Sequence, residues 1–298
     1  MEQNCNIKDV ALIFEGGGMR ASYTAAVVSV LLENGLYFKD VYGVSAGASH
    51  TVNYISQDAE RARKSFVDFL KDKRVAGIGP LMLAQGYFNA RYIYEECGLP
   101  NGTIPFDFQK FMANPAQMHI ESFNRSACGK VGATAYWTKL DTPTLPDLMR
   151  RVRASSSLPL VMPPVRIGND FYVDGGLGDS WGICLSEARR DGYERFFIVR
   201  TQMRGYRKQP DSRPWLTNLL FGRHKNLAKR QLERWQHYNA LCDEVERLER
   251  TGRAYVFYPE KMPINSMTID INRLAASYNA GLAQAKSELA LWRGFLGV

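Results

Sequence analysis

Short apolar runs alternate with helical patterns in the first fifty residues. Residues 10–14 (Val-Ala-Leu-Ile-Phe) are continuously apolar, as in a strand buried on both faces of a parallel sheet. After a glycine-rich turn, residues 21–34 read as a helix whose buried side carries Val27, Val30 and Leu31, and Gly35 is a natural stop. Residues 38–42 predict a second strand. This order predicts the start of a right-handed parallel α/β sheet.

The middle of the chain continues the same alternation. Helices are predicted over 58–71, 144–156 and 181–190, with shorter ones near 91–97 and 106–112. Strands are predicted over 117–123, 130–138, 165–167, 171–173 and 195–200, the first two as a hairpin and the next two around a tight turn. Residues 72–90 resemble a loop but carry Leu81, Met82, Leu83, Tyr87 and Phe88. This loop either walls a substrate cleft or forms an irregular buried connection.

The C-terminal third predicts two long helices around one last strand. Apolar positions recur at helical spacing from residue 227 to residue 250, a strand is expected over 254–258, and a helix over 272–295. We expect one catalytic domain over residues 8–205. Residues 206–298, a basic segment and the C-terminal helices, are expected to pack on that domain.

Composition limits the classes of protein that fit. The chain has 298 residues, of which 45% are hydrophobic and 23% charged, as in a globular protein with a sizeable core. Its apolar runs are far shorter than the ~20 residues of a membrane-spanning helix. No secretory signal is visible at the N-terminus. The five cysteines include no C-x-x-C pair, so neither a disulfide framework nor a zinc site is predicted, and a cytoplasmic location is expected.

Positive charge is concentrated in one segment. The net charge is +8, and residues 204–230 contain eight Lys or Arg residues against one Asp. Residues 215–221 (Trp-Leu-Thr-Asn-Leu-Leu-Phe) add apolar and aromatic side chains to this segment, a combination typical of interfacial helices. One hypothesis is peripheral docking on an anionic membrane through residues 204–230; the alternatives are a solvated surface and packing of 215–221 on the domain. Nucleic acid binding is disfavoured because no recognisable module is present.

Candidate chemistry begins at residues 43–47 (Gly-Val-Ser-Ala-Gly), which fit G-x-S-x-G, the turn that exposes a nucleophilic serine between a strand and a helix. Ser45 is the candidate nucleophile. Asp174 follows a predicted strand and precedes two glycines, so it is a candidate base. Gly16, Gly17 and Gly18 lie between a strand and a helix, where successive N–H groups can stabilise an oxyanion. Arg20 could hold that loop or meet an anionic head group.

Taken together, these motifs resemble those of the patatin-like phospholipases. Residues 16–20 match G-G-G-x-R, residues 43–47 match G-x-S-x-G, and residues 174–176 match D-G-G, in the family's order; residues 153–159 resemble its segment before D-G-G. The resemblance covers about residues 10–200. It implies a three-layer α/β/α fold with a mainly parallel sheet and a helical C-terminal region.

The resemblance also implies a mechanism and a substrate class. Ser45 would be the nucleophile and Asp174 the base of a dyad without histidine, with Gly16, Gly17 and Gly18 forming the oxyanion hole. The substrate would be an acyl ester of a lipid, chiefly a phospholipid, cleaved through an acyl-enzyme. The dyad requires Asp174 within hydrogen-bond reach of Ser45. No metal, calcium included, and no organic cofactor is implied.

Three alternatives remain open. A Ser-His-Asp α/β-hydrolase would use His224 or His237, although the elbow follows only two predicted strands and no histidine follows a strand near the C-terminus. Residues 16–18 could instead bind a nucleotide phosphate, but they match neither standard phosphate-loop pattern. The third alternative is a non-catalytic protein that binds anionic membranes.

Overall fold

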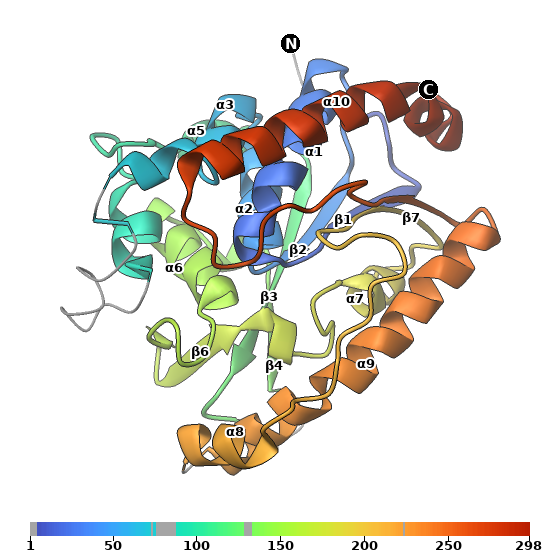
Figure 1. The fold of residues 1–298 in the computed structure, drawn as a ribbon. Helices are drawn as coiled ribbons and strands as arrows, with labels where there is room; N and C mark the ends of the chain where they lie inside the picture. Colours follow the sequence, from blue (N-terminus) through green and yellow to red (C-terminus); the bar gives the residue numbers. More distant parts are fainter. Residues whose placement is uncertain (1–4, 73, 76–87, 128–132, 223) are drawn as a thin grey trace.

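Five parallel strands form the centre of an eight-stranded sheet. The computed structural model describes residues 5–72, 74–75, 88–127, 133–222 and 224–298 (Figure 1). The strands are β1 (Val10–Phe14), β2 (Asp40–Val44), β3 (Gln117–Asn124), β4 (Thr134–Trp137), β5 (Val165–Ile167), β6 (Asp170–Asp174), β7 (Arg195–Val199) and β8 (Ala254–Phe257). Their order is β5-β6-β3-β2-β1-β7-β8, and β4 pairs with β3 in antiparallel fashion.

Helices cover both faces of this sheet. They are α1 (Ala21–Glu33), α2 (Ala46–Ile55), α3 (Ala59–Lys64), α5 (Phe108–Ala113), α6 (Leu145–Ser156), α7 (Leu185–Arg190), α8 (Pro214–Phe221), α9 (Lys225–Arg250) and α10 (Ile271–Leu296). Short turns of other helix types are η1 (Gly18–Arg20), η2 (Asp68–Lys71), η3 (Tyr92–Glu96), η4 (Lys139–Asp141) and η5 (Gly175–Leu177).

Alternation along β1 shows why there are three layers. Val10, Leu12 and Phe14 enter a core with α1, α2, α6 and α10. Ala11 and Ile13 enter a second core, on the other face, with α7 and α9. Figure 1 shows α1, α2 and α10 on one side of the strands and α7 and α9 on the other. The predicted three-layer α/β/α fold is confirmed.

The C-terminal region adds to all three layers. β8 extends the sheet in parallel with β7, α9 packs on one face, and α10 lies along α1 (Figure 1). The two helices approach closely, because a Cβ added at Gly281 of α10 would lie 2.2 Å from the carbonyl oxygen of Tyr23. The division of the chain at residue 205 stays a prediction.

Several predicted elements need correction. The helix predicted over 181–190 begins only at Leu185, because Trp181 (φ 51°) and Gly182 (φ 112°) have backbone angles that a right-handed helix cannot contain. The helix predicted over 58–71 is divided into α3 and η2, with Val67 between them at φ −126°. The helix of residues 21–34 is buried on every side from Ala21 to Leu31, and not only on the side of Val27, Val30 and Leu31; α10 packs against it.

Other predicted features are confirmed where the structure describes them. Asp58 caps α3 by accepting the N–H of Arg61 at 2.8 Å, and the Thr144 side chain caps α6. Strands β3 and β4 form the expected hairpin pair, although residues 130–132 of the second strand lie outside the described residues. No helix in the described ranges is both long and apolar enough to cross a membrane.

Candidate functional site

Ser45 occupies the sharp turn between β2 and α2. The backbone of Ser45, at φ 56° and ψ −126°, lies in a region that residues other than glycine rarely adopt. A Cβ added at Gly43 would lie 2.4 Å from the carbonyl oxygen of Gly47, and one added at Gly47 would lie 2.2 Å from that of Phe14. Both flanking glycines are therefore required by backbone contact. This strand–turn–helix context is the one that the G-x-S-x-G pattern predicts.

A serine from α6 supports the turn. The backbone N–H of Ser45 donates to Oγ of Ser155 at 2.9 Å, and the Ser155 side chain is fully buried. Ser155 belongs to residues 153–159, the segment that resembles the one preceding D-G-G in the patatin-like phospholipases. The serines of that segment are visible in the sequence, but the sequence does not show that one of them contacts the backbone of Ser45.

Pairing with β3 brings Asp174 next to Ser45. Along β3, Val44 of β2 pairs with Glu121, and Asp174 of β6 pairs with the next residue, Ser122. The parallel strand β2 and the antiparallel strand β6 therefore bring their C-terminal ends together. A Cβ added at Gly175 would lie 2.7 Å from Cγ2 of Val44, so the first glycine of D-G-G permits this contact.

The Asp174 carboxyl is buried and already partly hydrogen-bonded. Its Oδ1 accepts the N–H of Gly176 at 2.8 Å. Burial raises the pKa of Asp174 above its usual value, while Arg234 and the Ser45 hydroxyl act in the opposite direction. Oδ2 makes no hydrogen bond of ordinary length and angle with the described residues. The Ser45 hydroxyl is thus a neighbour of the carboxyl without full hydrogen-bond geometry, as is common in unliganded sites.

The glycine loop offers fewer free N–H groups than expected. The N–H of Gly16 donates to the carbonyl oxygen of Gly182 at 3.1 Å. Those of Gly17 and Gly18 have no hydrogen-bond acceptor within the described residues. Gly18 has φ 57°, and a Cβ added at Gly17 would overlap the Thr201 side chain at 2.4 Å. Gly17 and Gly18 are therefore the available donors, and Gly16 anchors the loop.

A buried ion pair lies directly behind the loop. Glu15 and Arg200, each with a side chain 2% exposed, are 2.9 Å apart, and Glu15 also accepts the N–H of Thr201 and the hydroxyl of Tyr238. Burial alone would raise the pKa of Glu15, but Arg200 and these hydrogen bonds hold it below its usual value. Tyr238 belongs to α9, so the C-terminal region helps to fix the loop. No sequence motif indicated this network.

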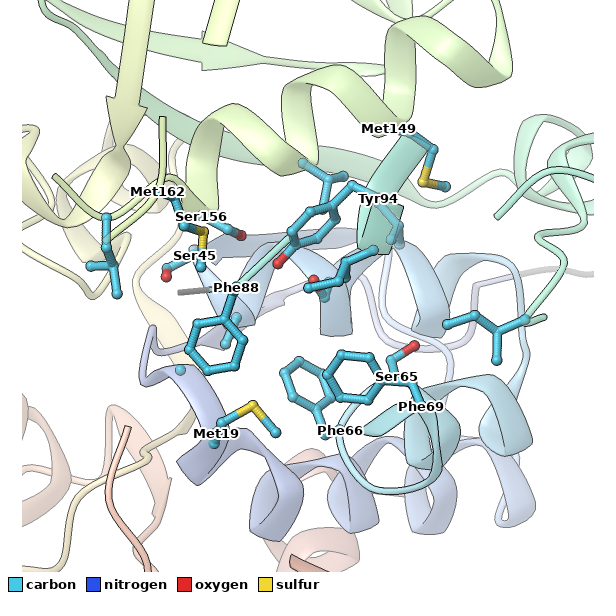
Figure 2. Close-up of a pocket in the computed structure, with 18 of the residues that line it drawn as sticks. Met19, Ser45, Ser65, Phe66, Phe69, Phe88, Tyr94, Met149, Ser156 and Met162 are labelled. Carbon is cyan, nitrogen blue, oxygen red and sulfur yellow. The ribbon is translucent and has the colours of Figure 1, made fainter. Parts of the chain in front are cut away.

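Two cavities meet at Ser45. Both are lined by Gly18, Ser45, Leu158 and Ser266. The first is apolar, and Figure 2 shows side chains such as Met19, Phe66, Phe69, Phe88 and Met162 around it. Phe88 therefore fits the expectation that residues 72–90 wall a cleft, whereas Leu81, Met82, Leu83 and Tyr87 lie outside the described residues.

The second cavity is polar, with a volume of about 280 Å³. It exposes the glycine loop and Asp174, and three cationic side chains line it: Arg20, Lys208 and Arg234. Arg20 was a predicted site residue. Lys208 and Arg234 were not, because they come from parts of the chain without a recognisable motif.

Comparison with known proteins identifies the family of this chain. The patatin-like phospholipase family matches residues 12–183, more than half of the chain. The chain belongs to the patatin-like phospholipase family. This family is one of the lipid acyl hydrolase families. Residues 224–297 match a separate domain of unknown function, DUF6363.

Two individual proteins are similar to this patatin-like chain. The uncharacterized protein YjjU of Escherichia coli K12 is 27% identical over 198 residues, which are 64% of this chain and 52% of that protein. The match thus spans about half the length of that relative. The crystal structure of VipD from Legionella pneumophila aligns with 95% of this chain and 67% of its own at 12% identity and a TM-score of 0.49.

None of the four histidines of this patatin-like chain lines either cavity. His50 is fully buried and lies 2.9 Å from the Thr24 hydroxyl, and burial lowers its pKa to about 3. His237 stacks on Trp181 with ring centroids 4.3 Å apart, and His119 pairs with Asp40. His224 precedes α9. This placement disfavours a Ser-His-Asp triad.

One group of side chains in the described ranges has the chemistry to hold a metal ion. Ligand atoms of Glu121, Cys184 and Glu187 lie within 4.8 Å of one another, and all three residues are buried. Burial raises the pKa of Glu121 to about 8 and that of Glu187 to about 9, which favours the neutral form of both carboxyls. The group lines neither cavity at Ser45, and no sequence spacing had indicated it.

Proposed function

We propose that this protein hydrolyses an acyl ester of a lipid, chiefly a phospholipid, through an acyl-enzyme at Ser45. The observation that carries the proposal is the position of Ser45, on a strained turn beside Asp174 and at the mouth of an apolar cavity. An apolar cavity suits an acyl chain, since burying each methylene gains about 0.8 kcal/mol. The membership of the patatin-like phospholipase family supports the same reaction.

The proposed reaction has two steps. Asp174 accepts the proton of the Ser45 hydroxyl while Oγ bonds to the ester carbonyl carbon, and the N–H groups of Gly17 and Gly18 stabilise the oxyanion. Collapse of this intermediate breaks the ester C–O bond, and the leaving alkoxide takes the proton from Asp174. Water then attacks the acyl-enzyme with Asp174 again as the base, which releases the fatty acid and restores the serine hydroxyl.

Labelling by a fluorophosphonate probe tests the nucleophile. We expect labelling of the wild type and of His237→Gln, and none of Ser45→Ala, with folding of each checked by circular dichroism. Labelling that survives in Ser45→Ala would place the nucleophile elsewhere. Loss of labelling in a folded His237→Gln or His224→Gln protein would favour the triad instead. The assay is repeated with lipid vesicles, so that a site that needs a lipid surface is not missed.

We also propose that helix α8 makes a peripheral contact with an anionic membrane. Trp215, Leu219 and Leu220 of α8 are 67%, 68% and 54% exposed, and α8 buries only Phe221. The exposed side chains argue against the alternative in which residues 215–221 simply pack on the domain. Arg213 and Lys225 flank the helix and are exposed, which suits anionic lipid.

The rest of the basic segment does not form the single positive surface that the sequence suggested. Arg204 pairs with Glu249, Arg207 pairs with Asp243 and Glu246, and Arg230 pairs with Asp179. Acidic side chains, most of them on α9, therefore neutralise much of the charge of residues 204–230. The membrane proposal now rests on the apolar surface of α8 and its two flanking cations.

A further inference from the structure

The polar cavity beside Ser45 collects positive charge that has no partner. Arg20 follows the glycine loop, Lys208 lies between β7 and α8, and Arg234 lies on α9, yet all three line the same cavity. None of them lies within 4.0 Å of a carboxylate oxygen of the described residues. The nearby carboxylate of Glu15 is already paired with Arg200. Asp174 also lines the cavity, so three cations face one carboxylate that is not in an ion pair, and the cavity has an excess of positive charge.

The hydrogen-bond capacity of these side chains is also unused. The Nε atoms of Arg20 and Arg234 are buried and have no hydrogen-bond partner in the described part of the chain. A buried N–H group without an acceptor is costly. By contrast, Arg204, Arg207 and Arg230 from the same part of the chain each hydrogen-bond to a carboxylate. The cavity is thus lined by three cationic side chains that no carboxylate of the described residues hydrogen-bonds.

Backbone positions around Asp174 are shaped to admit Arg234. A Cβ added at Gly176 would lie 2.5 Å from Nη2 of Arg234, and one added at Gly182 would lie 3.8 Å from it. The guanidinium therefore lies over the main chain of the D-G-G turn, next to the proposed base. Burial and the charges of Arg234 and Arg20 lower the pKa of Lys208 to about 8, while Glu15 acts in the opposite direction.

We infer that Arg20, Lys208 and Arg234 form a binding site for a phosphate group on the alcohol side of the scissile ester. The inference rests on the proposed hydrolysis at Ser45 for the direction of the substrate. With the acyl chain in the apolar cavity, the leaving alcohol lies in the cationic cavity. The three cations favour a phosphomonoester, which carries close to two negative charges at neutral pH. The substrate class is therefore an acyl ester of a phosphorylated alcohol, such as a monoacyl glycerol phosphate.

The inference also gives the C-terminal region a role at the site. Lys208 and Arg234 lie outside residues 12–183, and Arg234 lies within the domain of unknown function over 224–297. The patatin-like part would supply the reacting groups, and the C-terminal part would supply two of the three cations that select the head group.

Equilibrium binding tests the site without catalysis. The probes are the octyl ether of glycerol phosphate, which has no ester to cleave, and the octyl ether of glycerol, which lacks the phosphate. Both are titrated by calorimetry into the Ser45→Ala protein. We expect the phosphate to improve the affinity by about ten- to a hundredfold, the range of hydrogen-bonded charge pairs. Equal affinities, or tighter binding of the corresponding phosphocholine diester, would overturn the inference.

Substitutions then assign the effect to residues. In the Ser45→Ala background, Arg234→Gln should reduce the affinity ratio of the two probes by about tenfold, and Arg234→Lys by less. Arg250→Gln is the matched control, because Arg250 is exposed at the end of the same helix. An unchanged ratio in Arg234→Gln would overturn the assignment. If that variant fails to fold, the probe pair on the parent protein still decides whether a phosphate site exists.

The outcomes separate this inference from the proposed function. Selective binding of the phosphate probe by a protein whose wild type cleaves no ester would keep the anion site and reject the hydrolase. Cleavage of a neutral ester by a wild type whose Ser45→Ala form does not distinguish the probes would keep the hydrolase and reject the anion site.

Discussion

The two parts of the chain that meet at Ser45 differ in whether their site residues belong to recognisable sequence motifs. Residues 12–183 bring Ser45, Asp174 and the glycine loop, all inside short motifs. The C-terminal part brings Lys208 and Arg234 to the same site without any motif. A strained turn needs particular residues at fixed spacing because backbone atoms nearly touch there. A cation at the tip of a long side chain can reach a cavity from many backbone positions, so it leaves no local pattern.

If residues 12–183 supply the reacting groups, a substitution in one of their motifs should reduce the rate of the chemical step more than any substitution in the C-terminal part. Asp174→Asn keeps the size of the side chain and an acceptor for the Gly176 N–H, but it removes the base. We expect kcat on a soluble ester to fall by at least about a thousandfold, as for other residues that activate a nucleophile. Steady-state kinetics measure this loss, and a melting temperature within about 3 °C of the wild type shows that the fold is intact.

The opposite result would be informative. Substantial kcat in a folded Asp174→Asn protein would mean that another group accepts the serine proton. The proximity of Asp174 to Ser45 would then be structural only.

The ion pair of Glu15 and Arg200 tests whether the two parts of the chain stabilise each other, because its hydrogen bonds join the glycine loop to Tyr238 of α9. Arg200→Met leaves Glu15 buried without a cation, which should cost about 3–5 kcal/mol of folding stability. For a chain of this size, that corresponds to a melting temperature lower by about 5–8 °C. Differential scanning calorimetry measures the shift.

Two further variants make the ion-pair measurement decisive. Arg204→Met breaks an exposed pair with Glu249, and it should cost only about 0–1 kcal/mol. The double variant Glu15→Gln/Arg200→Met should recover part of the loss, because no buried charge is left alone. Equal losses in Arg200→Met and Arg204→Met would show that the buried network does not stabilise the loop.

The fold and the candidate reacting residues could both be predicted from the sequence because each depends on short local patterns. Continuous apolar strands such as residues 10–14 can only be buried on both faces, so layers of helices follow. Ser45 and Asp174 were readable because Gly43, Gly47 and Gly175 each prevent a backbone clash. The wrong elements were those set by tertiary contacts. The backbone of Trp181 and Gly182 prevents an early start of α7, and α10 packs on α1, which is buried on every side from Ala21 to Leu31.

The charge of the C-terminal part was misread in a similar way. Summing Lys and Arg over residues 204–230 treats each as exposed, but partners far along the chain decide the outcome. Glu249 and Asp243 neutralise two arginines, and the fold directs Lys208 into a cavity. Only the folded structure distinguishes a membrane-facing cation from a paired one.

The pH dependence of phosphate binding tests the cationic half of the site. Burial and the charge of Arg234 lower the pKa of Lys208 to about 8, so the side chain loses its charge above that pH and would gain a proton on binding phosphate. Below about pH 6 the phosphate itself becomes a monoanion. We therefore expect the affinity of Ser45→Ala for the phosphate ether to be highest between about pH 6 and 8 and to fall about tenfold by pH 9. Calorimetry in buffers of different ionisation enthalpy measures both the affinity and the proton uptake.

Other titratable groups face Lys208 and must be separated from it. They are Arg20, Glu15, Asp174, Tyr206, Arg234, Tyr238 and Cys242. Lys208→Arg keeps the charge at alkaline pH, so it should remove the decline above pH 8 while the acid limb stays. A decline that persists in Lys208→Arg would assign it to another of these groups.

The smallest expected effect is on membrane binding and comes from substitutions in α8, which lines neither cavity at Ser45. Replacing Leu219 and Leu220 by Ser removes two exposed apolar side chains, and we expect co-sedimentation with anionic vesicles to fall about threefold to fivefold. Leu140→Ser is the control, because Leu140 is 93% exposed on η4 and lies outside α8. Equal sedimentation of the α8 variant and the control would show that this surface does not contact the membrane. Equal sedimentation of the wild type with neutral and anionic vesicles would keep the apolar contact but remove the role of Arg213 and Lys225.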